Sequence, residues 1–137
     1  MYYLMNVLIT GSAGYIGYYF TKKITFKNSD INFICIDNLN DYYDKKIKNL
    51  RIKELKIIEN VKFFKLDIKD KKKINALFKK YKFREVYHFA AQAGVRYSEI
   101  NQQAYIDSNI TGFSNIIDAS KKGKINKFIY SSSSSVY

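Results

Sequence analysis

The feature that most constrains the fold is a glycine loop, G-S-A-G-Y-I-G, which directly follows the apolar run Val-Leu-Ile near the amino terminus. The loop spans residues 11–17, and the pattern after it predicts a helix. In a strand–loop–helix, Gly11 lets the chain turn sharply, Gly14 lets the backbone approach a pyrophosphate, and Gly17 lets the helix pack closely on the sheet. The N–H groups and dipole of that helix favour a diphosphate, so the loop predicts a dinucleotide site.

An acidic residue stands where such a site needs one. Asp37 ends a second apolar stretch, residues 32–36, and lies 20 residues beyond Gly17. A carboxylate there accepts hydrogen bonds from the adenosine ribose and repels a 2′-phosphate, which favours NAD over NADP as the cofactor. Asn38 follows, at a position where an NADP enzyme often carries Arg. The plain alternative is that Asp37 only ends a strand and caps a turn.

Apolar runs and helical patterns alternate along the chain. This alternation predicts an α/β fold, a Rossmann-type doubly wound parallel sheet with strand order 3-2-1-4-5. The expected strands are 6–10, 33–37, 61–66, 85–90 and 127–131, and the expected helices are 15–26, 46–57, one that starts near Asp70 as its N-cap, and 101–121, with a loop over 92–99. In the second helix the expected inward contacts are Leu50, Ile52, Leu55 and Ile58.

The chain stops directly after the fifth expected strand, whereas a complete Rossmann sheet has a sixth strand outside it. We therefore expect residues 1–137 to form one NAD(P)-binding domain that is truncated at its carboxyl end. The sixth strand and a substrate domain are expected to be absent.

Composition bounds the partners. The net charge is +12, but the excess is almost all Lys, spread along the expected helices and their ends, and phosphate and base recognition favours Arg. We therefore expect no nucleic-acid partner and attribute the lysines to A/T-rich codon usage. The chain has no apolar run long enough for a bilayer and no basic start typical of a signal peptide. Cys35 is the sole cysteine. These features predict a cytoplasmic protein without a membrane partner.

Several segments together resemble the extended short-chain dehydrogenase/reductase family, in its nucleotide-sugar epimerase and dehydratase branch. The resemblance covers the whole chain and is carried by residues 11–17, 37–44, 67–68, 88–98, 107–112 and 131–137. Segments 37–44 (D-N-L-N-D-Y-Y-D) and 91–98 (A-Q-A-G-V-R-Y-S) look most like UDP-glucuronate 4-epimerases. The resemblance implies an NAD-dependent enzyme that interconverts UDP-glucuronate and UDP-galacturonate by transient oxidation at C4. It also implies a homodimer for the complete protein.

The resemblance further implies the residues that contact NAD. They are Tyr15 and Ile16 at the pyrophosphate, Asp37, Asn38 and Asn40 at the adenosine, Asp67 and Ile68 beside the adenine, Phe89, Ala90, Ala91 and Gln92 along the centre, and Ser108 and Asn109 near the nicotinamide. Ser108 and Asn109 are expected to start the buried part of the long helix. Small side chains at Ala90 and Ala91 leave room for ribose and phosphate. For Asp67 and Asn109 the alternative is an ordinary polar residue at a strand end or on a helix.

A serine run, residues 131–135, follows the fifth expected strand. The resemblance implies that Ser133 is catalytic: its hydroxyl binds the reacting 4-OH and stabilises the developing negative charge. Ser134 is expected beside the substrate. A flexible loop is the alternative, but the carboxyl end of a central strand is where open α/β sheets bind ligands.

The same run bears on the reaction. Related 4,6-dehydratases carry an Asp-Glu pair where this chain has Ser134-Ser135. Two hydroxyls cannot do that acid–base work near neutral pH, which favours epimerisation. A dehydratase, another UDP-hexose epimerase and a non-catalytic NAD-binding module remain the alternatives.

The family's base is the Tyr of a Tyr-x-x-x-Lys motif downstream of the serine, and the given sequence has none there. Tyr18, Tyr19 and Tyr42 have a Lys at that spacing but precede Ser133 by about ninety residues or more, so we reject them. The chain alone is therefore expected to be inactive.

Two further residues invite a functional interpretation. Arg96 is expected near a uronate carboxylate or phosphate of the substrate, with a structural ion pair as an equal alternative. His88 is expected to be structural, because no second metal-type ligand is spaced near it and no metal site is predicted.

Overall fold

The computed structural model describes residues 5–133 and residue 136. The strands are β1 Met5–Thr10, β2 Ile31–Asp37, β3 Val61–Lys65, β4 Glu85–His88 and β5 Lys127–Tyr130. The helices are α1 Tyr15–Lys27, α2 Lys45–Lys56, α3 Lys71–Tyr81, α4 Val95–Ile100, α5 Gln102–Tyr105, the π-helical η1 Ile106–Gly112 and α6 Phe113–Lys122.

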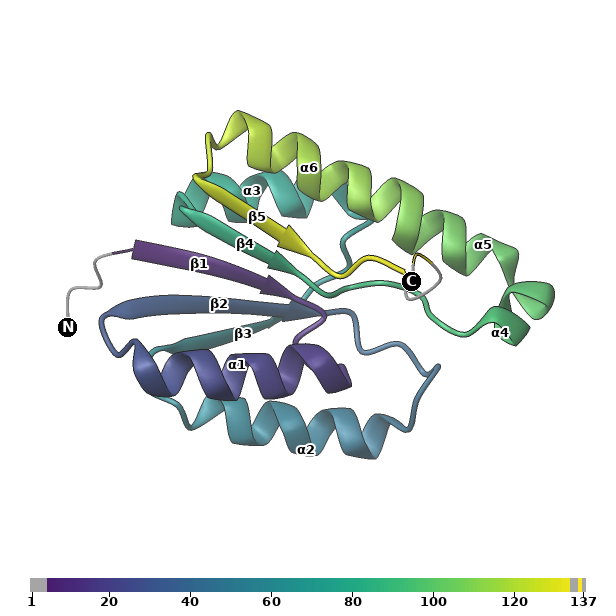
Figure 1. Cartoon of the computed structure of the whole chain (residues 1–137), viewed down its shortest axis with the longest axis horizontal. Helices are drawn as coiled ribbons and strands as arrows, with labels where there is room; N and C mark the ends of the chain where they lie inside the picture. Colours follow the sequence, from purple (N-terminus) through teal and green to yellow (C-terminus); the bar gives the residue numbers. More distant parts are fainter. Residues whose placement is uncertain (1–4, 134–135, 137) are drawn as a thin grey trace.

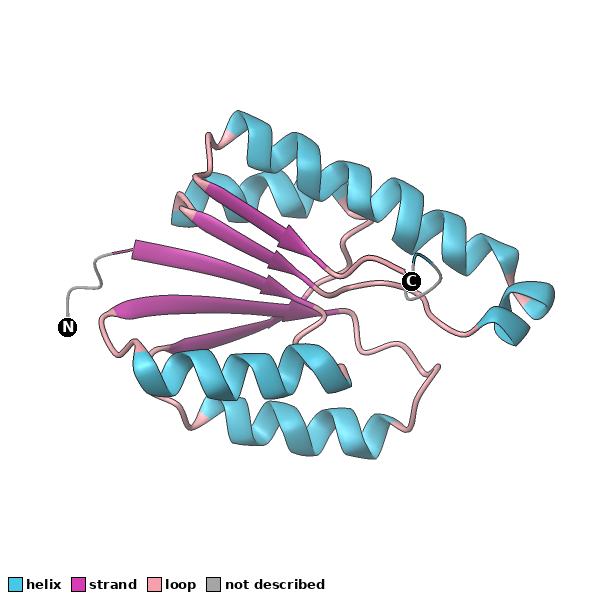
Figure 2. Cartoon of the chain, in the orientation of Figure 1, coloured by secondary structure: helices cyan, strands magenta, loops and turns pink. Residues whose placement is uncertain are grey.

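The strands form one parallel sheet in the order β3-β2-β1-β4-β5, which confirms the predicted fold and strand order. Helices α1 and α2 cover one face of the sheet, and α3 and α6 cover the other (Figures 1 and 2). Because all strands run the same way, their carboxyl ends meet at one edge, on the right of Figure 1. The loops that follow β1, β2 and β4 therefore come together at that edge, where α/β sheets of this kind bind ligands.

Side chains of alternate strand residues point to opposite faces and build two apolar clusters. On the α3 and α6 side, Leu8 and Ile34 pack with Ile116. On the α1 and α2 side, Phe33 and Cys35 pack with their neighbours. Both faces of the central strands are buried, which explains their nearly continuous apolar sequences. Cys35 is completely buried, and burial raises the pKa of its thiol to about 12.

The predicted inward contacts of helix α2 are correct except at one residue. Ile52 and Leu55 point inward as predicted, and Ile58 packs on the cluster from beyond the helix end. Leu50, however, is 59% exposed, so the prediction that it points inward is wrong. The buried stripe of α2 runs through Lys48, Ile52 and Leu55, at the spacing of one helix face, and Leu50 lies off that stripe.

The segment before β5 also differs from the expected loop and single helix. Helix α4 begins at Val95, inside the predicted loop. The chain then breaks at Asn101, whose side chain accepts a hydrogen bond from the Ala104 N–H and so caps a new helix start. A π-helical turn, Ile106–Gly112, separates α5 from α6. By contrast, Asp70 caps α3 as predicted, accepting from the Lys73 N–H at 3.1 Å.

Two leucines of α2 give a matched test of this core. We expect Leu55→Ala to lower the free energy of unfolding by about 2–5 kcal/mol, because it opens a cavity at a fully buried position. We expect Leu50→Ala to change it by less than about 0.5 kcal/mol, because that side chain is exposed. Urea denaturation of the two variants measures both values, and equal losses would contradict the orientation of α2.

Candidate functional site

The glycine loop joins β1 to α1, and two of its glycines, Gly11 and Gly17, are sterically required. Gly11 has a φ of +67°, and a Cβ there would lie 2.6 Å from the Ala90 nitrogen in the loop after β4. A Cβ on Gly17 would overlap the Gly11 carbonyl oxygen, so Gly17 permits close packing on the loop rather than on the sheet. Gly14 forms the N-cap of α1 and lines the cleft described below.

The amino terminus of α1 has no side-chain cap among the described residues, and its first turn has no acidic residue. The Gly14 N–H at the N-cap donates to the Gly11 carbonyl at 3.0 Å. The first backbone N–H groups of a helix have no partner inside the helix, and the helix dipole makes this end positive. Tyr15 and Ile16 have exposed side chains at this end of the helix, and their contact with a pyrophosphate stays a prediction.

Asp37 ties the second strand to the glycine loop. Its carboxylate is buried and accepts one hydrogen bond from the Ala13 N–H at 3.0 Å and one from the Leu39 N–H at 2.9 Å. The structural alternative for Asp37 is therefore true in part, since the residue does cap a turn. A carboxylate has about four acceptor positions, so two accepted bonds leave capacity for hydroxyl groups of a ligand.

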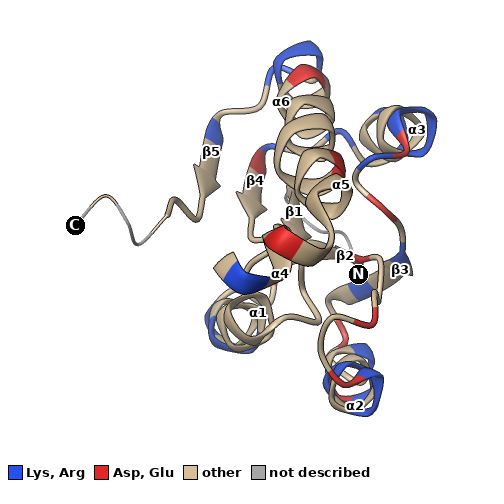
Figure 3. Cartoon of the chain, turned by 90° about the vertical axis from the view of Figure 1, so that its right-hand side faces the viewer, with Lys and Arg blue, Asp and Glu red and all other residues tan. Residues whose placement is uncertain are grey.

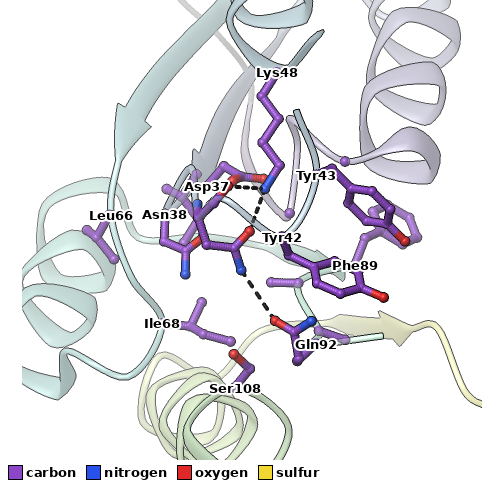
Figure 4. Close-up of a pocket in the computed structure, with 16 residues that line it drawn as sticks. Asp37, Asn38, Tyr42, Tyr43, Lys48, Leu66, Ile68, Phe89, Gln92 and Ser108 are labelled. Atoms are coloured by element: carbon purple, nitrogen blue, oxygen red, sulfur yellow. Dashed lines mark hydrogen bonds between the residues drawn. The ribbon is translucent and has the colours of Figure 1, made fainter. Parts of the chain in front are cut away.

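A cleft that is open to solvent lies at the carboxyl edge of the sheet. Its lining is Gly11, Gly14, Ile36, Asp37, Asn38, Asn40, Tyr42, Tyr43, Lys48, Leu66, Ile68, Phe89, Ala90, Ala91, Gln92 and Ser108. Figure 4 shows Asp37 and Lys48 on one side of the cleft and Gln92 and Ser108 on the opposite side. Most of the residues predicted to contact a dinucleotide are thus brought together in one place.

Two predicted residues support the cleft without lining it. Asp67 accepts hydrogen bonds from the Asn38 side chain at 3.1 Å and from the Lys69 N–H at 3.0 Å. Asn109 was expected to start the buried part of a helix, but it is exposed, and burial begins at Gly112. Asn109 instead exchanges hydrogen bonds with the backbone of Gln92, at 2.8 and 2.9 Å. Both residues therefore hold loops that line the cleft, and their contacts with NAD stay predictions.

Lys48 is the main cleft residue that the sequence analysis missed. It is buried on the inward stripe of α2, and its ammonium donates to the Asn40 side chain at 2.6 Å and to the Asn40 carbonyl at 3.0 Å. Burial lowers the pKa of Lys48, while the nearby carboxylate of Asp37 opposes that shift. A lysine in a lysine-rich helix is normally expected to be solvated. Only the spacing of Lys48 from Ile52 and Leu55, which places all three on one helix face, could have indicated that Lys48 is buried.

The residues predicted on the substrate side lie elsewhere. Arg96 is exposed on α4 and Ser133 is exposed beyond the end of β5; neither lines the cleft. Ser134 lies outside the described residues. The catalytic and substrate-binding roles of these three residues stay predictions.

The basic residues do not gather in one place. Lys and Arg residues lie on α1, α2, α3 and α6, which cover both faces of the sheet (Figure 3). No helix of the described chain is long and apolar enough to cross a bilayer. Among residues 5–133, no three His, Cys, Asp or Glu side chains group together as a metal site would require.

His88 is structural, as predicted. It is buried at the end of β4, its Nδ1 lies 2.8 Å from the Thr10 hydroxyl, and its ring packs against Phe113 and Phe128. Burial lowers the pKa of His88 to about 4, so the ring is neutral at physiological pH.

A known protein family matches nearly the whole chain. The family model described as GDP-mannose 4,6 dehydratase matches residues 8–137. The chain belongs to this family. Among relatives, an uncharacterised protein of Methanocaldococcus jannaschii is 44% identical over 132 residues, which are 96% of this chain and 40% of that protein. The UDP-glucuronate 4-epimerase of Thermodesulfobacterium geofontis is 39% identical over 130 residues, which are 95% of this chain and 40% of that enzyme.

Solved members of the same fold resemble the chain closely. The UDP-glucuronic acid 4-epimerase of Bacillus cereus, in complex with UDP-glucuronic acid and NAD, superposes with a TM-score of 0.86 at 33% identity. The match covers 97% of this chain and 41% of the Bacillus enzyme. This chain of the GDP-mannose 4,6 dehydratase family thus spans about 40% of the length of the relatives it matches.

The burial of His88 makes a prediction about pH. Its folded pKa of about 4 lies below the ordinary value of 6.5, so the unfolded chain binds a proton that the folded chain does not. The contribution of His88 to the free energy of unfolding is complete above about pH 6.5. It is lost as the pH falls toward 4, and the total loss is roughly 3 kcal/mol.

Unfolding free energies measured between pH 4 and 7 test this, with His88→Gln as the control. Because His88 is the only histidine, the variant should lose the part of the pH dependence that centres between these two pKa values. An NMR titration in which the single imidazole titrates near pH 6.5 would contradict its burial.

Proposed function

We propose that the chain is the NAD-binding part of a UDP-sugar 4-epimerase whose substrates are UDP-glucuronate and UDP-galacturonate. The observation that carries the proposal is the buried carboxylate of Asp37, held beside the glycine loop in the cleft that most of the predicted NAD-contacting residues line. Support comes from similar enzymes: a solved UDP-glucuronic acid 4-epimerase at TM-score 0.86 holds both NAD and UDP-glucuronic acid.

The residues of the cleft fit a dinucleotide. The uncapped amino terminus of α1 would bind the diphosphate, and Gly14 adds no side chain in its way. Asp37 would accept the hydroxyls of the adenosine ribose with the acceptor positions that its two backbone bonds leave over. The small side chains of Ala90 and Ala91 leave the centre of the cleft open.

NAD, when bound, supplies a hydride acceptor for oxidation of the sugar at C4. The residues of this chain would position that reaction. Ser133 follows β5 at the carboxyl edge of the sheet, and its hydroxyl would bind the reacting 4-OH and stabilise the negative charge that develops there. Ser134 and Arg96 would contact the substrate. The general base, a Tyr with its Lys, would come from outside this chain.

The proposal includes the organisation of the whole protein. Residues 1–137 would form an incomplete dinucleotide-binding domain, with a sixth strand beside β5 and a substrate domain supplied by further sequence. The complete enzyme would be a cytoplasmic homodimer, and the chain alone would bind NAD without turning over substrate.

A 4,6-dehydratase is the second candidate, because the matching family model carries that description. Dehydration needs an acid–base pair, and the sequence has hydroxyls at Ser134 and Ser135. These two serines lie outside the described residues, so the argument for epimerisation rests on their chemistry. UDP-glucuronate has a carboxylate at C6 and no 6-hydroxyl to eliminate, so the distinguishing substrate is UDP-glucose. A 4,6-dehydratase would release water from UDP-glucose, whereas a 4-epimerase specific for uronates would invert C4 of UDP-glucuronate and release no water from either sugar.

Cofactor choice is the first test. We expect NAD to raise the melting temperature of this chain by several degrees at about a hundred times its dissociation constant, and NADP to raise it less. The reason is that the 2′-phosphate of NADP would face the carboxylate of Asp37. The measurement is thermal unfolding with each dinucleotide. Asp37→Asn, which keeps one acceptor oxygen, should narrow the difference, and equal protection of the unmodified chain would contradict the role of Asp37.

The catalytic role is tested in the complete protein. We expect Ser133→Ala to lower the turnover of UDP-glucuronate by about two orders of magnitude or more, the range seen when an acid–base or oxyanion partner is lost. Binding of NAD should be unchanged. Ser131→Ala, a substitution in the same serine run of residues 131–135, serves as the matched control. Turnover equal to that of the unmodified enzyme would remove Ser133 from the mechanism.

A further inference from the structure

We propose that Tyr42 closes the cofactor cleft through a contact with the loop after β4, and that this contact controls how long a dinucleotide stays bound. The inference rests on the proposed NAD binding and adds the side chains that govern release. It concerns two loops, residues 38–44 after β2 and residues 89–94 after β4. Both β2 and β4 pair with β1, one on each side, so the loops approach the cleft from opposite directions.

The two loops meet where Tyr42 lies on Gly94. A Cβ added to Gly94 would overlap the Tyr42 hydroxyl and lie 3.0 Å from its ring carbon Cζ. Gly94 also has a φ of +94°, which side chains other than hydrogen disfavour. The glycine therefore allows the tyrosine to approach the opposite backbone more closely than any other residue would.

An aromatic chain extends this contact into the helices that follow. The ring of Tyr42 lies 4.8 Å from that of Tyr97 on α4, which lies 6.3 Å from that of Tyr105 on α5. The Tyr105 hydroxyl donates to the Ala93 carbonyl at 2.8 Å and also contacts the Gly94 carbonyl. The loop after β4 is thus held from behind, and Tyr42 is the side chain that joins the other loop to it.

A second, weaker link runs beside the aromatic one. The Asn40 side chain donates to that of Gln92 at 3.4 Å, near the limit for a hydrogen bond. Each partner is fixed on its own side, Asn40 by Lys48 and Gln92 by Asn109. Each side of the cleft is therefore held by its own hydrogen bonds. Among the described residues, the two sides are joined by the Tyr42 ring, which contacts Gly94 and Tyr97, and by the long hydrogen bond between Asn40 and Gln92.

These contacts would allow the two loops, residues 38–44 and residues 89–94, to separate. Tyr42 and Gln92 both line the cleft, so separating the loops would widen it while leaving each side intact. In the proposed reaction the cofactor is restored in every turnover and need not leave. Loops in contact would keep the cofactor in place between turnovers, and Tyr42 would set the rate at which the loops separate.

The rate of cofactor release tests the proposal. NADH is bound to the chain, excess NAD is added in a stopped-flow instrument, and the decay of bound NADH fluorescence gives the dissociation rate. We expect Tyr42→Leu to raise this rate at least tenfold. Tyr97→Leu, on the opposite side of the contact, should raise it similarly. The double variant should exceed the faster single variant by less than about twofold, because both changes break one contact.

Tyr130→Leu is the matched control. Tyr130 is an exposed tyrosine on β5 that does not line the cleft, and its ring pairs with Phe113 and Phe128. We expect a rate within about threefold of the unmodified chain. Equal acceleration by Tyr130→Leu, or unchanged rates in both Tyr42→Leu and Tyr97→Leu, would overturn the proposal. Failure of the unmodified chain to bind NADH would instead overturn the proposed function on which it rests.

Discussion

The hydrogen bond from the Ala13 N–H to the carboxylate of Asp37 is the interaction on which the candidate site depends. It ties the end of β2 to the glycine loop between β1 and α1. It also sets the direction of the Asp37 side chain, which a second bond from the Leu39 N–H completes. One buried carboxylate thus holds the loop that begins α1 and presents its remaining acceptor positions to the cleft.

Around this bond the site is organised as two supported sides. On one side, Lys48 holds Asn40, and Asp67 holds Asn38. On the other, Asn109 pairs with the backbone of Gln92. The residues that support the cleft are polar side chains bonded to loop segments, because loops at the carboxyl edge have no strand partners to satisfy their backbone groups. Their support keeps an open cleft in shape with few apolar contacts.

Much of this arrangement could be predicted from the sequence, because it follows from local patterns. The glycine spacing, the apolar runs and the acid after the second run determine the sheet order and the position of Asp37. The errors concern contacts between distant segments. Leu50 is apolar but lies off the buried stripe, and Lys48 is charged but lies on it. The break at Asn101 and the π-helical turn depend on capping and on the loop after β4, which helical periodicity does not show.

The burial of the single histidine and the single cysteine has a consequence for the electrostatics of the molecule. These are the residue types whose ordinary side-chain pKa values lie nearest neutrality. Here the pKa of His88 is lowered to about 4 and that of Cys35 is raised to about 12. Neither side chain changes its charge near neutral pH, so the field around the cleft gains no titrating contribution from them. A change of charge in the cleft would instead arise from groups such as Lys48, which lines it and whose pKa burial lowers.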